Sequence, residues 1–426
     1  MNRQTTRISP ADMDRQRDFC QKLHERFAAR PSAPLAFVDT YGCQQNEADS
    51  ERLRGYLSEM GYQFTQSEAE ADLIVINTCA IREHAEMRVL GNVGALVHTK
   101  RAKPGQLICV CGCMAQEPHM AQKIKDSYRQ VDLVFGPHAL WRFPELLYRL
   151  VTRRGRIFDI ADEPGSIAEG IPLVRQEGVK AWVSIMYGCN NFCTYCIVPY
   201  TRGPERSRSA EEVLRECEAL AAAGIPEIVL TGVNTCAYSD SGYDLGQLVK
   251  RIAAIPGDFH IRLSSTEPKF DNLKLLDSLK ECGGKVCRFL HLSLQHGSDE
   301  ILRKMGRKYT AKEYAEFAAY ARSLWPDIHL GTDVIVGFPG ETDELFNEGV
   351  EFVKSMNFAN IHIFRYSPRP GTPAAGFPDR VPGEVAKARY DIMAQAAEES
   401  RKRFYASQKG KILPVIFEEE KNGLIH

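Results

Sequence analysis

Residues 188–203 read GCNNFCTYCIVPYTRG and place Cys189, Cys193 and Cys196 in a CxxxCxxC pattern. Disulfides use cysteines in pairs and closed zinc sites use four ligands, so three neighbouring cysteines match neither arrangement. Thiolates at these spacings can surround one face of an iron–sulfur cluster and leave one iron without a protein ligand. The residues alone leave two alternatives open, a zinc loop with a distant fourth ligand and a group of buried thiols.

Apolar segments alternate with helical segments around and after this motif. The apolar segments are 181–187, 227–232, 260–265, 289–294, 329–338 and 359–367. Helical patterns lie between them, such as SAEEVLRECEALAAAG at 209–224. Six successive β/α units predict a partial (β/α)6 barrel, with its active site at the carboxyl ends of the strands.

Three earlier apolar runs each end at a cysteine and lead into a helical pattern. They are LAFVDTYGC (35–43), ADLIVINTC (71–79) and QLICVCGC (106–113). Continuous apolar strands between helices predict an α/β domain with an open parallel sheet covered on both faces. Strand ends in such a sheet share one edge, so Cys43, Cys79 and Cys113 can converge there. The alternative is that each is a small buried residue.

The patterns divide the 426 residues into five segments. These are a helical arm (1–34), the α/β domain (35–148), a linker (149–178), the partial barrel (179–409) and the start of a small β element (410–426). The composition, 44% hydrophobic and 26% charged, is ordinary for a globular protein.

Composition also excludes several classes of protein. The polar first residues rule out a signal peptide, and no apolar run approaches the ~18 residues of a membrane span. Thirteen cysteines in such a chain indicate metal ligands, redox groups or buried side chains, and favour a cytoplasmic location. The net charge of −1 does not indicate nucleic-acid binding, so that role falls to local basic clusters. The clusters are Arg202, Arg206 and Arg208, and Arg303, Lys304, Arg307 and Lys308.

CxxxCx(aromatic)C after the first barrel strand resembles the radical S-adenosylmethionine superfamily. The resemblance implies that Cys189, Cys193 and Cys196 hold a [4Fe–4S] cluster. Its free iron would chelate the amino and carboxylate groups of S-adenosylmethionine, and reduction would generate a 5′-deoxyadenosyl radical. Tyr195 would then lie near the adenine.

Three further motifs are similar to the amino-terminal domain of methylthiotransferases: DTYGCQQNEADSE, INTCAIRE and CGCMAQE. They imply that Cys43, Cys79 and Cys113 hold a second [4Fe–4S] cluster, which carries or supplies the inserted sulfur. Cys109 and Cys111 are expected to be packing residues. The remaining cysteines do not lie in a recognised motif and are expected to be structural: Cys20, Cys217, Cys236, Cys282 and Cys287.

The barrel strand ends supply the expected cofactor contacts. By their position in the superfamily, Gly232 and Asn234 would meet the methionine moiety of S-adenosylmethionine. The other expected cofactor-binding residues are Ser264, Ser265, Glu267, Gln295 and the basic Arg202, which could also meet an RNA phosphate. Each polar residue alone can equally cap a helix or stabilise a loop.

The resemblance spans the chain from residue 35 onward and implies a reaction. The expected activity adds a methylthio group to C2 of N6-isopentenyladenosine at position 37 of tRNA. Threonylcarbamoyladenosine in tRNA and a ribosomal protein are alternative substrates, and a non-catalytic metal-containing RNA-binding protein is an alternative of another class. The expected partners are tRNA, an electron donor and a sulfur source. Residues 410–426 look like the first strands of a TRAM domain, so we expect this domain to be cut short.

Overall fold

The computed structural model describes residues 6–80, 83–153, 155–160, 165–175, 178–268, 273–413, 415–418, 420–421 and 424–425. The chain divides into two compact units. The amino-terminal unit comprises Met1–Glu177, Tyr187–Cys189 and Val198–Arg208, and the barrel unit comprises Gly178–Met186, Asn190–Ile197 and Ser209–His426. None of the described helices has the length and apolar character needed to cross a membrane.

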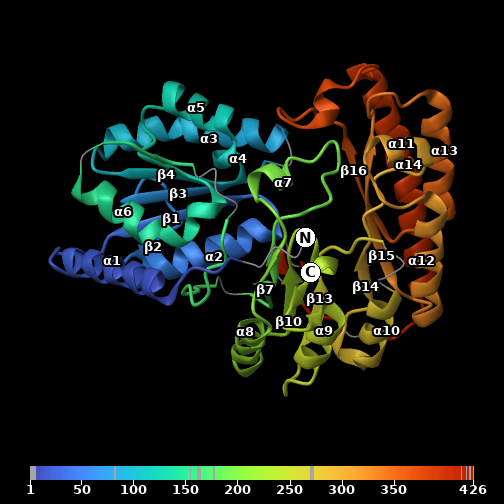
Figure 1. The fold of residues 1–426 in the computed structure, drawn as a ribbon, viewed down its shortest axis with the longest axis horizontal. Coiled ribbons are helices and arrows are strands. Elements are labelled where there is room, and N and C mark those ends of the chain that lie inside the picture. The colour runs from blue at the N-terminus through green and yellow to red at the C-terminus, as the bar shows by residue number, and fades with distance from the viewer. Residues whose placement is uncertain are drawn as a thin grey trace. The chain divides into compact units, whose positions relative to one another are not determined.

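The amino-terminal unit contains a six-stranded sheet with the order β2-β1-β3-β4-β5-β6 (Figure 1). All of its strand pairs are parallel. The strands are β1 (Leu35–Tyr41), β2 (Gln63–Phe64), β3 (Leu73–Thr78), β4 (Leu107–Gly112), β5 (Leu133–Phe135) and β6 (Ile157–Asp159).

Helices cover both faces of this sheet. The helical elements of the unit are α1 (Pro10–Ala28), α2 (Gln44–Glu59), α3 (Glu83–Ala102), α4 (Cys113–Gln116), α5 (Pro118–Ser127), η1 (Pro137–Arg142), α6 (Phe143–Thr152) and α7 (Val198–Thr201), of which α7 packs against α4. Leu73 and Val75 of β3 belong to a core with α1, α2 and α6, whereas Ile74 and Ile76 belong to a core with α3, α4 and α5. This two-sided burial is why β3 is continuously apolar.

The barrel unit contains two three-stranded parallel sheets, β13-β10-β7 and β14-β15-β16. Two parallel bridges, Ile261↔Val286 and Thr266↔Leu292, connect the segments around β13 and β14. The strands are β7 (Lys180–Ser184), β10 (Glu227–Thr231), β13 (His260–Leu263), β14 (Phe289–His291), β15 (His329–Val336) and β16 (Asn360–Arg365).

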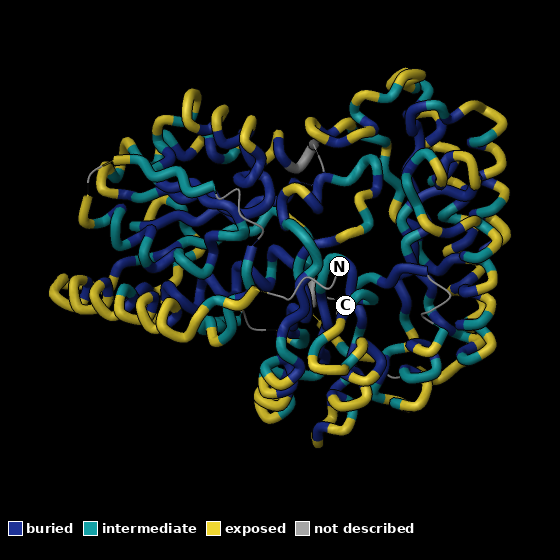
Figure 2. Tube along the Cα trace, viewed as in Figure 1, coloured by how far each residue is buried: buried dark blue, intermediate teal, exposed yellow. Residues whose placement is uncertain are grey.

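One hydrophobic core joins these strands to the surrounding helices. In Figure 2 the strands are mostly buried, whereas the exposed residues lie on the outer sides of the helices. The helices are α8 (Ala210–Ala222), α9 (Leu245–Ala253), α10 (Leu273–Glu281), α11 (Asp299–Lys304), α12 (Ala311–Leu324), α13 (Asp343–Ser355) and α14 (Gly383–Gln408). Short elements complete the unit: η2 (Thr235–Ala237), β11 (Ser239–Asp240), β12 (Tyr243–Asp244), η4 (Gly283–Lys285), η5 (Pro373–Gly376), β17 (Glu420–Lys421) and β18 (Leu424–Ile425). Two further short strands, β8 (Met186–Tyr187) and β9 (Arg206–Ser207), flank the cysteine loop in sequence.

The predicted α/β fold class is confirmed, including the parallel sheet and the order of the barrel strands. Among the described residues no ladder pairs β16 with β7, so the barrel is partial.

Two details differ from the expectation. The helix after Cys113 breaks at Glu117, which is extended (φ −74°, ψ 120°) because Pro118 follows it. The amino-terminal unit also extends beyond residue 148, because β6 pairs with β5 in the same sheet.

Candidate cofactor and substrate site

Strand register brings the ends of the three cysteine-bearing strands to one level of the amino-terminal sheet. Tyr41 of β1 is paired with Thr78 of β3, and Thr78 is paired with Gly112 of β4. The three cysteines follow within two residues of these ends: Cys43 at the N-cap of α2, Cys79 directly after β3 and Cys113 at the start of α4. The predicted convergence at one sheet edge therefore has the required backbone geometry.

Gly112 makes the turn from β4 into α4 possible. Its φ is 95°, and a Cβ at this position would lie 2.3 Å from the carbonyl oxygen of Thr78. Only glycine tolerates both this backbone region and this close approach. The turn places Cys113 at the carboxyl edge of the sheet.

A buried amide network holds the loop of Cys43 against β3. The Oδ1 atom of Asn46 accepts from the amide and the Sγ of Cys43, both at 3.4 Å. The Nδ2 atom of Asn46 donates to Asn77 Oδ1 and to Thr78 O, both at 3.1 Å, and Asn77 Nδ2 donates to Asn46 O at 2.8 Å. Sequence reasoning did not single out these two residues. A polar residue inside the apolar run of β3 was the available signal for Asn77.

Electrostatics favour a thiolate at Cys43. A hydrogen bond with the Cys79 side chain lowers the pKa of Cys43 to about 6. Burial acts in the opposite direction, and the charge of Arg202 lowers the pKa further. Burial raises the pKa of Cys113 to about 11, although Arg202 acts in the opposite direction. The thiolate is the form that binds metals. The lowered pKa of Cys43 favours this form, whereas the raised pKa of Cys113 means that a neighbouring cation is needed to favour it.

Arg202 is that cation. Its Nε donates to Cys113 Sγ at 3.0 Å and its Nη2 donates to Asp49 Oδ2 at 2.9 Å. Burial alone would lower the pKa of Arg202, but Cys113, Asp49 and Cys43 outweigh it and raise the pKa well above its usual value. Arg202 was expected to meet a cofactor carboxylate or RNA phosphate. Its side chain is buried and contacts a thiol and a carboxylate.

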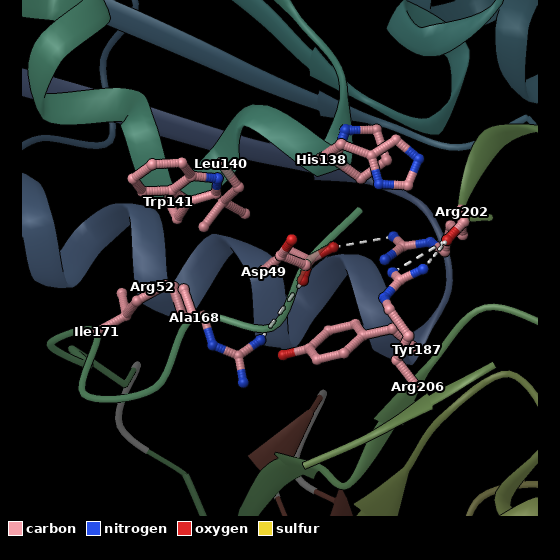
Figure 3. Close-up of a pocket in the computed structure, with 12 residues that line it drawn as sticks. Asp49, Arg52, His138, Leu140, Trp141, Ala168, Ile171, Tyr187, Arg202 and Arg206 are labelled. Carbon is pink, nitrogen blue, oxygen red and sulfur yellow. Dashed lines mark hydrogen bonds and ion pairs between the residues drawn. The ribbon is translucent and has the colours of Figure 1, made fainter. Parts of the chain in front are cut away.

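A cavity of about 50 Å³ in the amino-terminal unit is lined in part by Arg202 and Asp49 (Figure 3). Asp49, Arg52, Arg202 and Arg206 line it, so guanidinium groups outnumber carboxylates. His138 also lines the cavity, and burial together with Arg206 and Arg202 lowers its pKa to about 4. The wall of the cavity is therefore cationic, with a neutral imidazole.

Other cysteines of this unit pack in its hydrophobic core. Cys109 and Cys111 belong to the hydrophobic core on the α1, α2 and α6 side of the sheet. Burial raises the pKa of both thiols well above the usual value. Both behave as packing residues, as expected.

The CxxxCxxC segment is distributed over the two units, with Cys189 in the amino-terminal unit and Cys193 and Cys196 in the barrel unit. Cys189 and Cys193 are buried, and Cys196 is half-buried. Within the barrel unit the loop is fastened to the end of α11: Thr194 N donates to Met305 O at 2.9 Å, and Thr194 Oγ1 donates to Lys304 O at 2.8 Å.

Arg307 contacts the thiol of Cys193, as Arg202 contacts the thiol of Cys113. Its Nη1 donates to Cys193 Sγ at 3.2 Å, and its Nη2 lies 3.6 Å from Glu267 Oε1. Glu267 also accepts from Asn191 Nδ2 in the cysteine loop. The sequence grouped Arg307 with its basic neighbours, of which Arg303 and Lys308 are exposed. Nothing in the local pattern distinguished Arg307 from these neighbours.

Tyr195 packs into a small core with Ile301, Met305, Ile335 and Phe338. Burial raises the pKa of its hydroxyl well above the usual value. Its neighbour Phe192 is 54% exposed and has a φ of 47°. This backbone region is rare for an aromatic residue and marks the loop as locally strained.

The other expected cofactor residues lie at strand ends of the barrel unit. The Oγ of Ser264 is buried and has no hydrogen-bond partner among the residues that the structure describes. Gln295 has a φ of 73° and links β14 to β15 through its backbone, donating to Asp333 O and accepting from Ile335 N, both at 2.8 Å. Asn234 is buried, and the carbonyl of Ser265 accepts from Thr235 Oγ1. A Cβ on Gly232 would lie 2.7 Å from Met186 Cγ, so a larger residue would require the Met186 side chain to shift.

Comparison with known proteins agrees with these observations. The Radical SAM superfamily matches residues 183–353, and the Uncharacterized protein family UPF0004 matches residues 36–136. A tRNA-2-methylthio-N(6)-dimethylallyladenosine synthase of Acetivibrio thermocellus is 42% identical over 424 residues, covering 98% of this chain and 88% of that protein. A protein of the same name from Caldicellulosiruptor saccharolyticus is 43% identical over 393 residues, covering 91% and 83%.

A solved structure shares the fold. The radical S-adenosylmethionine methyltransferase TsrM from Kitasatospora setae matches with a TM-score of 0.60 at 15% identity, covering 80% of this chain and 75% of that chain. Fold, cysteine patterns and family matches together define a radical S-adenosylmethionine enzyme. Within that class, the chain belongs to the family of tRNA-2-methylthio-N(6)-dimethylallyladenosine synthases.

Proposed function

We propose that this chain replaces the hydrogen at C2 of N6-dimethylallyladenosine in tRNA with a methylthio group. Two cysteine trios support the proposal, because each has a buried arginine on one thiol and each lies in a segment matched by a separate family. The relatives that span nearly the whole chain are named for this reaction. This membership also favours an enzyme over a non-catalytic metal-containing RNA-binding protein.

The donor chemistry of both trios fits iron–sulfur clusters. We assign Cys43, Cys79 and Cys113 to one [4Fe–4S] cluster and the CxxxCxxC cysteines to another. Cysteine thiolates are the usual ligands of such clusters, and the pKa of about 6 at Cys43 favours the thiolate. With three cysteine ligands, each cluster would supply one free iron, for S-adenosylmethionine in the CxxxCxxC site and for sulfur in the other.

The surrounding residues position these ligands. Arg202 and Arg307 each place a permanent cation on one thiol, and at Cys113 this cation lowers the pKa against the effect of burial. Their partners Asp49 and Glu267 hold the guanidinium groups in orientation. We assign both arginines as positioning residues.

Cofactor recognition falls to the strand-end residues in this proposal. Ser264 offers a buried hydroxyl without a described partner, and the main chain at Gln295 is held in a positive-φ conformation at the end of its strand. Gly232, Asn234, Ser265, Glu267 and Tyr195 complete the proposed set for S-adenosylmethionine. A tRNA substrate, an electron donor and a sulfur source are the proposed partners, and a tRNA substrate favours a cytoplasmic location.

Mass spectrometry of tRNA nucleosides tests the proposal. The full chain would be reconstituted anaerobically with iron and sulfide and incubated with S-adenosylmethionine, a reductant and tRNA that contains N6-dimethylallyladenosine. The expected product carries SCH₃ in place of one hydrogen, and tRNA that lacks the dimethylallyl group serves as the control. Cleavage of S-adenosylmethionine without this product would contradict the substrate assignment and direct the search to threonylcarbamoyladenosine or a ribosomal protein.

A further inference from the structure

Two histidines and an aspartate meet on neighbouring strands of the barrel unit, and none of them belongs to either cysteine motif. They are His291 on β14, Asp333 on β15 and His362 on β16, and we call them the His–Asp–His cluster. Asp333 is paired directly with His362, and His291 is paired with Gly331, two residues before Asp333. The strand period of two therefore puts all three side chains on one face.

That face is the inner one. Alternate residues of the same strands pack against the helices in the hydrophobic core: Leu290, Leu292, Leu330, Val334 and Ile361. The His–Asp–His cluster lies on the opposite side, toward the barrel interior. His291 precedes Gln295 by four residues, which is about 13 Å of extended chain from the proposed cofactor residues.

The three side chains point their ligand atoms at one another. His291 Nε2 lies 3.1 Å from Asp333 Oδ2, and His362 Nδ1 lies 3.2 Å from Asp333 Oδ1. Ligand atoms of all three residues lie within 4.8 Å of one another. The two contacts use different oxygens of Asp333. Atoms ~3.1–3.2 Å apart subtend about 95–100° at a metal with ~2.1 Å bonds, so either contact alone suits a pair of ligands on one ion.

Neighbouring residues shape the cluster. A Cβ on Gly331 would lie 3.2 Å from His291 Nδ1, so the glycine leaves room for that imidazole. The Nδ2 atom of Asn360 lies 3.0 Å from His362 Nε2. If the amide is flipped, its oxygen takes this place, accepts from the Nε2–H of His362 and leaves Nδ1 free to bind a metal.

The charge around the cluster suits a cation. Arg262 lies over the ring of Phe289, two residues before His291, and is paired with both carboxylate oxygens of Glu227, at 2.8 and 3.0 Å. Its charge is therefore compensated away from the cluster. Asp333 lies between the two imidazoles as the carboxylate of the group.

We propose that the His–Asp–His cluster binds one divalent first-row transition-metal ion, of the Zn²⁺ or Fe²⁺ type, through His291 Nε2, His362 Nδ1 and Asp333. Two imidazoles and one carboxylate are a known ligand set for these ions, and they leave further positions for water. The metal would tie the edge strand β16 to β15 and β14. This site is independent of the proposed function, because it uses neither cysteine trio.

Metal retention by the reconstituted enzyme tests this proposal. With the cysteines occupied by clusters, the protein would be incubated anaerobically with Zn²⁺, Co²⁺ or Fe²⁺ in separate arms and freed of excess metal by gel filtration. Elemental analysis is expected to show about one additional metal ion per chain. The arm with the tightest retention identifies the preferred ion.

Two variants address the ligands, and a third is the control. His362→Gln removes a side chain that is 51% exposed, so folding should persist, and Asp333→Asn keeps the shape of the carboxylate. Each is expected to reduce retained metal at least about tenfold, because losing a ligand should weaken binding no less than losing an outer-shell partner. His260→Gln is the control, since this barrel histidine contacts Gly284 O instead. Its metal content should match that of the unsubstituted protein.

Thermal unfolding gives a second readout. Added Zn²⁺ should raise the melting temperature of the unsubstituted protein but not that of His362→Gln, because a ligand stabilises only the state that binds it. The proposal is overturned if the unsubstituted protein retains no metal beyond its cluster iron in any arm. Equal retention by His362→Gln would overturn it as well.

Discussion

At the scale of single residues, the two cysteine trios share one device, a buried guanidinium on a thiol. Arg202 contacts Cys113 and Arg307 contacts Cys193, and each arginine also lies beside a carboxylate. A guanidinium presents several donors in a rigid fork, so it can hold a thiolate and a carboxylate together. An ammonium group cannot reproduce this geometry.

Arg202→Lys should therefore weaken the site of Cys43, Cys79 and Cys113 while leaving the other site intact. The variant keeps the charge but loses one of the two oriented contacts, at 3.0 and 2.9 Å. We expect methylthiolation to fall by about 10–100-fold, which is the usual effect of removing a partner of a metal ligand. Iron content should drop toward that of one cluster, with S-adenosylmethionine cleavage retained.

The matched control is Arg208→Lys, because Arg208 is similarly buried but pairs with Glu169 at 2.9 Å. Its iron content should equal that of the unsubstituted protein. An Arg202→Lys variant with full iron and full activity would show that the thiol contact has no role.

Arg307→Lys should give the complementary result. It loses a contact of 3.2 Å to Cys193, so S-adenosylmethionine cleavage should fall at least about tenfold. Iron held by Cys43, Cys79 and Cys113 should be unaffected. Arg303→Lys is the control, since Arg303 is exposed in the same segment. S-adenosylmethionine cleavage should therefore fall in Arg307→Lys and not in Arg303→Lys. Equal cleavage rates in these two variants would contradict the role of Arg307 at Cys193.

At the scale of elements, strand ends set the site. Apolar runs that end at cysteines predicted β1, β3 and β4, and the structure adds that Tyr41, Thr78 and Gly112 are in register. Register depends on contacts between strands. The sequence could therefore indicate that the three cysteines lie at one edge of the sheet, but not which residues of the strands are paired there. The role of Asn46 and the thiol contact of Arg307 were not predicted for the same reason, because their partners lie far away in the chain.

Gly112→Ala should disrupt the turn that positions Cys113. The new Cβ would lie 2.3 Å from Thr78 O at a φ of 95°. We expect a loss of about 2–4 kcal/mol in the free energy of unfolding, from backbone strain and overpacking. Urea denaturation measures it. Gly105→Ala is the control, since no atom lies within 4 Å of its Cβ position, and an equal effect there would refute the steric argument.

At the scale of the whole molecule, His138 should make stability depend on pH. Burial and two arginines lower its pKa from 6.5 to about 4 in the folded state. Between these values the unfolded chain binds a proton that the folded chain does not, so acidification favours unfolding. The contribution is complete above pH ~6.5 and is lost as the pH falls to about 4, with a limit of about 3 kcal/mol. Urea denaturation from pH 7 to 4 measures how the free energy of unfolding changes with pH. This change should be smaller for His138→Gln than for the unsubstituted protein, and an equal change would contradict the assignment to His138.

The central claim is that two separate parts of the chain build two cluster sites. Iron analysis of the anaerobically reconstituted protein tests it directly, using one variant with Cys43, Cys79 and Cys113 changed to Ser and another with Cys189, Cys193 and Cys196 changed to Ser. After any ion of the His–Asp–His cluster has been removed by a chelator, the unsubstituted chain should hold about eight iron atoms and each variant about four. Loss of all iron in a variant that remains folded, or full iron in either variant, would contradict the account.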